Sequence, residues 1–596
     1  MRNAETILGI IRNRGTRGLP VNDLYRQLWN PNLYLMAYGR IAKNDGALTP
    51  GATPETADGM KMDDIHAIIE ALRFERYRWT PARRVYIPKA NGKRRPLGLP
   101  TWSDKVLQEV MRLLLEAYYE PQFSDRSHGF RPQRGCHTAF TEITRTWTGT
   151  TWFIEGDIAG CFDNIDHKVL LEILGENIQD NRFLRLVSNL LRAGYLEDWK
   201  LHATYSGTPQ GSVVSPILAN VYLDRLDRFV EGVLLPDYNR GRQRKRNLEY
   251  RRTFRQIEHL RKTGRGNEVE DLRQHLRTLP YGDTHDPDYR RLRYIRYADD
   301  FLLGFAGPKN EADEIKARLG RFLRDNLKLE LSDAKTLVTH GRTEAARFLG
   351  YEVAVQQSDT KLDANGLRSV NGTIGLRVPS DVIRAKCAIY MRGGKPIHLG
   401  ARLHDSPYSI VRQYQLEFRG VANYYRRAIN LGALSRLRWV MEMSLAKTLA
   451  SKLKISVPQV FKRYKTTIRT DNGPRKVLMV TEAQPGQKPL VTYWGGVSLV
   501  RDNTATLIDK QPPILNGRTE IVERLLANTC ELCGSTVKVQ VHHVRALKDL
   551  RKKGRAKPPA WMEIMAARRR KTLVACASCH ADIHAGRPLK QNVEAA

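Results

Sequence analysis

Two adjacent acids between two apolar runs constrain the fold of this chain more than any other feature. Asp299 and Asp300 follow the run at 293–297 and precede the apolar run at 301–305. Runs of this kind predict two β-strands, so the acids should lie at the tip of a β-hairpin. Because adjacent carboxylates repel each other, we expect a cation to neutralise this tip.

A third acid stands in a similar setting far upstream, where Asp157 ends the run at 152–157. If the fold places Asp157 beside Asp299, the acids could hold two Mg²⁺ ions about 3.5–4 Å apart, with Asp300 as an accessory ligand. The backbone carbonyl of Ile158 could also reach a metal. Such a site stabilises both oxygens of an in-line phosphoryl displacement, which is the chemistry of polymerases. Taken alone, each aspartate could instead be a turn residue or a helix cap.

The charge of the chain predicts a long polyanion as its partner. Lys and Arg total 98 against 63 Asp and Glu, a formal net charge of +35 in 596 residues, and the basic residues are spread along most of the chain. Binding should therefore depend strongly on salt. No apolar run approaches the roughly 18 residues of a membrane helix, so no membrane partner is expected.

We expect a cytoplasmic location, since the first 20 residues lack the apolar segment of a signal peptide. An organellar matrix is the alternative location, because residues 1–17 carry arginines and few acids. We prefer to interpret this segment as an RNA-binding helix.

Two CxxC pairs near the C-terminus predict a metal site. Cys530 and Cys533 form the first pair, and Cys576 and Cys579 the second. Four thiolates form a closed tetrahedral site for Zn²⁺, and this spacing suits a metal better than disulfides.

Four histidines interleave with these cysteines. His542 and His543 lie between the two pairs, and His580 and His584 follow with the i, i+4 spacing of one helical face. Neutral imidazole suits both metal binding and base catalysis near pH 7. The alternative is a purely structural zinc module that binds DNA, which leaves the histidines unexplained.

Six blocks in order resemble those of group II intron-encoded reverse transcriptases and maturases, and the resemblance covers nearly the whole chain. The blocks are 95–100 and 127–132 (fingers motifs), 155–167 (motif A), 207–216 (motif B), 297–300 (motif C) and 348–351 (the end of the palm). The resemblance implies a multidomain α+β fold. It comprises a right-hand polymerase with an antiparallel palm sheet, a helical thumb called domain X, a basic DNA-binding region, and a small zinc-bound ββα-metal HNH module.

The domain boundaries follow from the same resemblance and from shifts in composition. They are 1–80 for an RNA-binding extension that starts the fingers, 81–355 for fingers and palm with a helical insertion at about 236–292, 356–465 for the thumb, 466–525 for the DNA-binding region and 526–596 for the HNH endonuclease.

The resemblance also implies residues that contact the incoming nucleotide. Phe162 would pack where a ribose 2′-OH would sit, although a core Phe is the competing interpretation. Gln210 would brace the nucleotide, and Gly211 permits close backbone approach.

Three cations complete the predicted nucleotide site. Lys89 and Arg95 flank a predicted hairpin and could clamp triphosphate oxygens. For these two, ordinary surface charge is an equal alternative. Lys335 is a candidate proton donor to pyrophosphate.

Aromatic and basic residues interleave on predicted helices of the thumb, a pattern that suits phosphates and unpaired bases. The RNA-binding candidates are Arg412, Tyr414, Arg419, Tyr424, Tyr425, Arg426 and Arg427. The alternative is that several of the tyrosines belong to the core of amphipathic helices.

In the C-terminal module the resemblance assigns His543 as the general base that activates water. It assigns His542, His580 and His584 as ligands of one catalytic divalent metal, Mg²⁺ or Mn²⁺. The middle Asn of the HNH pattern is not evident, and Lys571 or Thr572 occupies that neighbourhood.

The predicted function is that of a multifunctional mobile-intron protein. It would assist splicing of its group II intron RNA, nick one strand of double-stranded target DNA to leave a primer, and copy the RNA with dNTPs. A splicing factor with decayed enzymatic activities is the first alternative, and another class of reverse transcriptase or a DNA-templated polymerase is the next. The intact Asp157, Asp299, Asp300 and Gln210 argue against decay.

Overall fold

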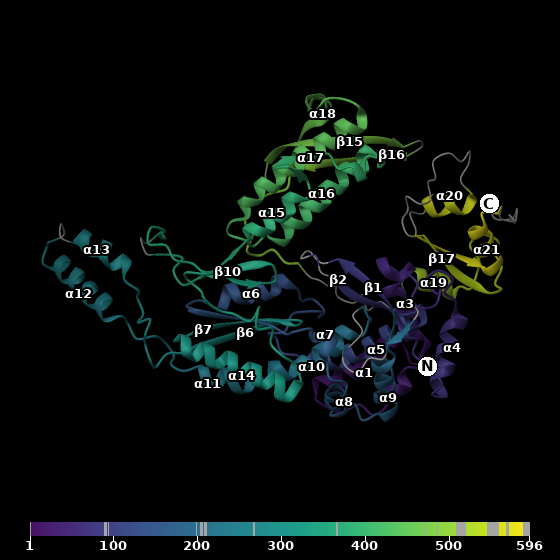
Figure 1. Cartoon of the computed structure of the whole chain (residues 1–596), viewed down its shortest axis with the longest axis horizontal. Helices are drawn as coiled ribbons and strands as arrows, with labels where there is room; N and C mark the ends of the chain where they lie inside the picture. The colour runs from purple at the N-terminus through teal and green to yellow at the C-terminus, as the bar shows by residue number, and fades with distance from the viewer. Residues whose placement is uncertain are drawn as a thin grey trace.

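The computed structural model describes residues 2–88, 92, 94–197, 200–202, 207, 211–265, 269–364, 368–470, 473–484, 487–507, 520–544, 559–567 and 571–587. The elements form an elongated molecule, with a helical arm at one end and the yellow C-terminal module at the other (Figure 1). A unit of long helices projects from the middle of the body (Figure 1). Among the described residues, no helix combines the length and apolar composition that crossing a bilayer requires.

A four-stranded antiparallel sheet forms the centre of the body. Its strands are β3 (Trp152–Asp157), β6 (Arg291–Tyr297), β7 (Asp300–Ala306) and β8 (Val338–His340), in the order β6-β7-β3-β8. Both faces of the sheet are covered. On one face Ile154 joins the core of α14 (Lys309–Leu327), and on the other face Phe153 joins that of α6 (Cys136–Thr146). The sheet thus separates two large apolar cores.

Helices from the first half of the chain pack beside this sheet. They are α1 (Ala4–Thr16), α2 (Leu24–Gln27), α3 (Pro31–Ile41), η1 (Asp45–Leu48), α4 (Met62–Arg73), α5 (Trp102–Tyr119), η2 (Glu120–Gln122), α7 (Cys161–Asn164), α8 (His167–Gly175) and α9 (Asn181–Arg192). Helix α5 is buried almost all round. A Cβ on Gly15 of α1 would lie 2.0 Å from the Tyr118 carbonyl oxygen, so glycine allows the two helices to touch.

The chain forms a second four-stranded sheet. Strands β1 (Ala82–Pro88) and β2 (Arg94–Leu99) form an antiparallel hairpin, and β4 (Tyr195–Glu197) adds to β1 in parallel and carries β5 (Lys200–His202), so the order is β2-β1-β4-β5. Most of the turn between β1 and β2, including Lys89, lies outside the described residues.

The arm leaves and rejoins the body at neighbouring points. After α10 (Ser215–Phe229), η3 (Val230–Leu234) and α11 (Leu235–Tyr238), the chain forms α12 (Leu248–Lys262) and α13 (Val269–Thr278), which lie in the interval expected for a helical insertion. These two helices share a small core of their own. Arg240 and Arg290 exchange backbone hydrogen bonds of 3.2 and 3.0 Å at the base of the arm.

The projecting unit follows a second small sheet of β9 (Ala346–Phe348), β10 (Tyr351–Val355) and β11 (Ile374–Arg377). Its elements are α15 (Ser380–Ala388), β12 (Met391–Arg392), β13 (Lys395–Pro396), η5 (Gly400–Arg402), α16 (Pro407–Tyr424), η6 (Leu431–Leu434), α17 (Ser435–Leu453), α18 (Val457–Tyr464), β14 (Lys465–Thr470), β15 (Gly473–Gln484) and β16 (Gln487–Gly495). Leu478 and Trp494 of the last sheet are buried in the same core as Phe418 of α16. The expected boundary at 465/466 therefore does not coincide with a break in the core.

The C-terminal module consists of α19 (Glu520–Leu526), β17 (Val539–His543), α20 (Ala560–Ala567), β18 (Thr572–Cys576) and α21 (Ala577–Ala585). Strands β17 and β18 pair antiparallel, and α21 follows directly. Val541 and Val574 belong to the same apolar core as the N-terminal helices, so the module is packed against the body rather than tethered to it.

Candidate functional sites

Three carboxylates meet at one end of the central sheet. Asp157 is the last residue of β3 and stands directly opposite Asp300, the first residue of β7. Tyr297 of β6 pairs with Asp300, so Ala298 and Asp299 form the tip of the β6–β7 hairpin. The structure therefore has the expected hairpin and brings together the three acids predicted to meet.

The carboxylates share a partly buried site in which negative charge is unfavourable. Burial, with the nearby charges of Asp299 and Asp157, raises the pKa of Asp300 to about 7. Burial is also the main cause that raises the pKa of Asp299, with a further contribution from Asp157. Hard divalent cations are the natural partners of clustered carboxylate oxygens, so these residues fit a metal site.

One cation already faces the site. The Lys335 ammonium lies 2.9 and 3.1 Å from the two carboxylate oxygens of Asp157, and its positive charge stands in for that of a metal. The loop that carries it is fixed to β3, since the Ser332 amide donates to the Asp157 carbonyl at 2.8 Å. Ile158, the next residue, is buried and forms a β-bridge with Leu331.

A buried ion pair lies next to the Ala298 turn and is bonded to it. The Arg296 guanidinium donates to both carboxylate oxygens of Asp227 at 2.8 and 2.6 Å, and neither side chain is exposed. The Tyr294 hydroxyl donates to the same carboxylate at 2.7 Å. Arg296 also donates to the Ala298 carbonyl at 2.8 Å and to the Ser127 hydroxyl at 2.9 Å. The sequence analysis missed this network because its members lie far apart along the chain.

The Ala298 turn is left-handed, with φ of 56°, and it is covered closely by the segment 127–132. The His128 amide donates to the Arg296 carbonyl at 2.9 Å. A Cβ on Gly129 would lie 2.3 Å from the Ala298 nitrogen, so only glycine fits there. This close packing gives the 127–132 block a physical role in holding the turn.

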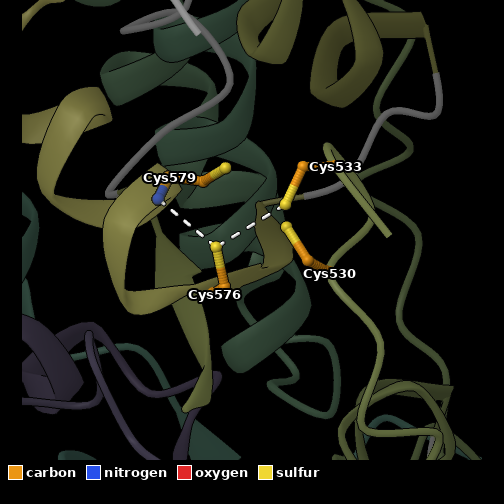
Figure 2. A group of neighbouring side chains, drawn as sticks. All are labelled: Cys530, Cys533, Cys576 and Cys579. Carbon is orange, nitrogen blue, oxygen red and sulfur yellow. Dashed lines mark hydrogen bonds between the residues drawn. The ribbon is translucent and has the colours of Figure 1, made fainter. Parts of the chain in front are cut away.

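The four predicted zinc cysteines converge in the C-terminal module (Figure 2). Cys576 ends β18, Cys579 lies in the first turn of α21, and the other two come from the turn before β17. The Cys533 and Cys576 sulfurs lie 3.7 Å apart. Thiolates about 2.3 Å from a tetrahedral zinc ion would lie about 3.8 Å apart, so the residues fit this ion.

Three of the predicted histidines form a second cluster. His580 Nε2 lies 3.1 Å from His542 Nδ1 and 3.1 Å from His584 Nε2. Asp58, from the loop before α4, joins them at 3.3 Å from His542, 3.2 Å from His580 and 2.8 Å from His584. The sequence analysis missed Asp58, because no local pattern marks it.

His543 points away from the other three histidines. Its Nε2 lies 2.9 Å from the Tyr38 hydroxyl of α3, and burial lowers the pKa of His543 to about 4. Among the described residues, Tyr38 is the side chain that bonds to this ring. Lys571 and Thr572, which lie near the position of the middle Asn, have other partners: the Lys571 carbonyl accepts from the Val544 amide, and the Thr572 hydroxyl accepts from Arg524.

Three stretches of the chain match known families. Residues 87–249 match reverse transcriptase (RNA-dependent DNA polymerase), 380–484 match type II intron maturase, and 530–580 match AI2M/AI1M-like HNH endonuclease. Over 584 residues the chain is 39% identical to the group II intron-encoded protein LtrA of Lactococcus lactis subsp. cremoris, with 94% of each chain covered. The chain belongs to the group II intron-encoded proteins.

Two proteins encoded in yeast introns are also similar over most of this chain. A 91 kDa protein of a cob intron in Schizosaccharomyces pombe is 34% identical over 95% of this chain and 70% of its own length. A COX1/OXI3 intron 1 protein of Saccharomyces cerevisiae is 31% identical over 94% of this chain and 69% of its own. The protein thus combines reverse transcriptase, maturase and HNH endonuclease domains, whose families use divalent metals and act on intron RNA, DNA and deoxynucleotides.

The nucleotide-binding candidates of this intron-encoded protein lie around the carboxylates to different extents. Arg95 is exposed on β2, and its charge reaches Asp299, where it partly opposes the rise in pKa that burial causes. Phe162 is half-buried, with its ring 6.2 Å from that of Phe130. Gly211 has φ of 101°, and a Cβ there would lie 2.5 Å from the Gly98 carbonyl oxygen of β2. Its close backbone approach is therefore to the chain itself. Lys89 and Gln210 lie outside the described residues.

The predicted RNA contacts of the intron-encoded protein require a correction. Tyr414 is fully buried, with its hydroxyl 2.9 Å from Ser444 Oγ. Tyr425 is buried and donates to the Gly350 carbonyl at 2.9 Å. Arg427 is buried and donates to the Ala505 carbonyl at 2.8 Å. These three side chains are buried in the unit and do not lie on its surface.

The other candidates differ in exposure. Tyr424 and Arg426 are half-buried and donate to the carbonyls of Leu349 and Ser498. Arg412 and Arg419 are exposed on α16 and, seven residues apart, share one face of the helix. This exposed pair is the part of the predicted RNA-binding set that lies on the surface.

Proposed function

We propose that Asp157, Asp299 and Asp300 are the polymerase carboxylates of this reverse transcriptase and that the central sheet is the palm of a right-hand fold. The observation that carries the proposal is the register that sets Asp157 opposite Asp300 at the tip of the β6–β7 hairpin. Two Mg²⁺ ions held there, with the Ile158 carbonyl as a further ligand, would neutralise charge on the reacting phosphates.

The residues around the carboxylates have complementary roles in this proposal. Arg95 binds triphosphate oxygens, because it is exposed on the fingers hairpin and close enough to act on Asp299. Phe162 packs against the sugar and disfavours a 2′-OH. Lys335, with its ammonium beside Asp157, neutralises or protonates the leaving pyrophosphate. We also assign Lys89 to the triphosphate, and Gln210 and Gly211 to the loop that braces the nucleotide.

Incorporation of deoxynucleotides on a primed RNA template with Mg²⁺ tests this assignment. Asp299→Ala should abolish extension, whereas Asp325→Ala, which removes an exposed acid at the end of α14, should not. Splicing of the parent intron should survive Asp299→Ala, because RNA binding does not need the carboxylates. Wild-type protein that binds RNA and supports splicing but does not extend a primer would favour the decayed splicing factor instead.

For the C-terminal module we propose a zinc-stabilised ββα-metal nuclease that nicks the target DNA and leaves a 3′-OH primer. His543 acts as the general base, and its low pKa keeps the imidazole neutral at pH 7. His542, His580 and His584 would hold one Mg²⁺ or Mn²⁺, which supplies a Lewis acid for the scissile phosphate. The convergence of their ring nitrogens supports this assignment.

The remaining domains follow from the packing. We place the thumb at about 356–495, because the last three-stranded sheet shares its core, and the DNA-binding region after it, up to about 525. Residues 1–80 and the exposed face of α16 would contact intron RNA. The protein would then work as a ribonucleoprotein at the nucleoid of a bacterial host, or in an organellar matrix.

A further inference from the structure

The nuclease site contains a residue from the opposite end of the chain. Asp58 accepts a hydrogen bond from the His543 amide at 2.6 Å across 485 residues of sequence. Its backbone is fixed as well, since the Gly59 amide donates to the Val541 carbonyl at 2.8 Å and the Val541 amide donates to the Met60 carbonyl at 3.1 Å. This segment extends the free edge of β17, so Asp58 is held in place and does not reach the site by chance rotation.

The contacts among the ring nitrogens are those of metal ligands rather than of hydrogen bonds. His580 Nε2 lies 3.1–3.2 Å from His542 Nδ1, His584 Nε2 and an Asp58 oxygen. A single ring nitrogen carries at most one proton, so it can donate only one of these three contacts. Ligand atoms about 2.1 Å from a tetrahedral metal lie about 3.4 Å apart, close to the separations seen here.

We propose that Asp58 is the fourth ligand of the nuclease metal in the resting protein, and that a phosphate of the target DNA replaces it during cleavage. The inference rests on the proposed assignment of the three histidines. At the tetrahedral spacing described above, four protein ligands close the site, whereas a catalytic site keeps one position open for substrate. Carboxylate and phosphate oxygens are ligands of the same hard type, so one can take the place of the other.

His543, the proposed general base, is also bonded to a residue from the N-terminal part of the chain. The Tyr38 hydroxyl lies 2.9 Å from His543 Nε2, and both side chains are buried. Tyr38 and Asp58 both come from the N-terminal part of the chain, so the polymerase body covers the catalytic face of the nuclease. DNA must displace both groups before water can be activated, which would keep the nuclease silent until its target is bound.

Mn²⁺ binding to the full-length, zinc-loaded protein tests the inference, with free Mn²⁺ measured by electron paramagnetic resonance. His584→Ala identifies the binding step that belongs to the nuclease. Asp58→Asn keeps the size and the acceptor for the His543 amide, and it should weaken that step at least tenfold, as losing support at a metal site does. Asp63→Asn, an exposed acid on α4, is the matched control and should change nothing.

Each result decides the question. If Asp58→Asn leaves the Mn²⁺ affinity unchanged while His584→Ala still abolishes the binding step, then Asp58 is not a ligand, and the histidine assignment stands. If His584→Ala abolishes no Mn²⁺-binding step, both the histidine assignment and the role of Asp58 are wrong. At saturating Mn²⁺, Asp58→Asn should nick target DNA at least as fast as wild type. A tenfold slower rate would show that Asp58 is needed during cleavage, which contradicts its displacement. Asp58→Glu should restore Mn²⁺ affinity, which separates ligation from a folding defect.

Discussion

Replacing Asp227 with alanine removes the carboxylate that forms the buried ion pair with Arg296 next to the Ala298 turn. Although burial opposes the charged form, Asp227 holds the pKa of Arg296 above its ordinary value. The variant would leave a fully buried guanidinium without its counter-ion and a Tyr294 hydroxyl without its acceptor. Breaking a buried pair from one side costs about 3–5 kcal/mol, most of it the penalty of the uncompensated charge.

Hydrogen exchange measures this loss where it occurs. Amides of β6 and β7 that exchange by local opening should become at least about 10²-fold faster, because every 1.4 kcal/mol is a factor of ten. Asp237→Ala is the matched control, since Asp237 is exposed and a surface ion pair such as the one it forms with Arg318 is worth about 0–1 kcal/mol.

A double variant separates stability from function. Replacing both Asp227 and Arg296 with methionine should restore slow exchange, because apolar residues can replace a buried ion pair at little cost. Primer extension should stay low, since Ala298 would still lack the guanidinium that binds its carbonyl. Recovery of extension in the double variant, or exchange less than tenfold faster in Asp227→Ala, would refute the argument that this pair positions the turn.

Four further outcomes follow from the described contacts. The pKa of Asp300 rises from 3.8 to about 7 on folding, so its carboxyl costs stability increasingly as pH rises between these values. In Mg²⁺-free buffer, Asp300→Asn should therefore raise the midpoint of thermal unfolding at pH 8, and raise it by less at pH 5. An equal increase in the midpoint at both pH values would contradict the raised pKa of Asp300. Cys576→Ser should lower bound zinc measured by mass spectrometry and abolish nicking, while primer extension persists. Arg412→Ala with Arg419→Ala should reduce the salt dependence of RNA binding by about 1.4–1.8 in log–log slope. Tyr414→Phe should leave RNA binding unchanged and cost about 0.5–1.5 kcal/mol of stability.

Local patterns allowed the three carboxylates at the end of the central sheet and both C-terminal clusters to be predicted from the sequence. Strand alternation places Asp299 at a hairpin tip, and the i, i+4 spacing sets His580 and His584 on one side of α21, so neighbouring residues are enough to find them. Asp58 and Asp227 could not be found in this way. Their partners lie 485 and 69 residues away, and only the packed fold brings them together.

The predictions for the projecting unit were limited for a different reason. Interleaved aromatics and cations on a helix are compatible with either an RNA-binding face or a core face, and burial of Tyr414 decides for the core. The boundary at 465 followed a change in composition. Apolar residues such as Leu478 and Trp494 are too sparse in that basic segment to reveal from sequence that it completes the neighbouring core.

The base of the arm has a consequence for how such proteins can vary. Because Arg240 and Arg290 are joined backbone to backbone, the 49 intervening residues begin and end at one point on the body. The Arg240–Arg290 pair can hold α11 and β6 together whatever the length of the arm, and the small core of α12 and α13 is separate from the two large cores. The arm is thus a segment whose length and charge can vary while β6, the strand that leads into the Ala298 turn, keeps its place.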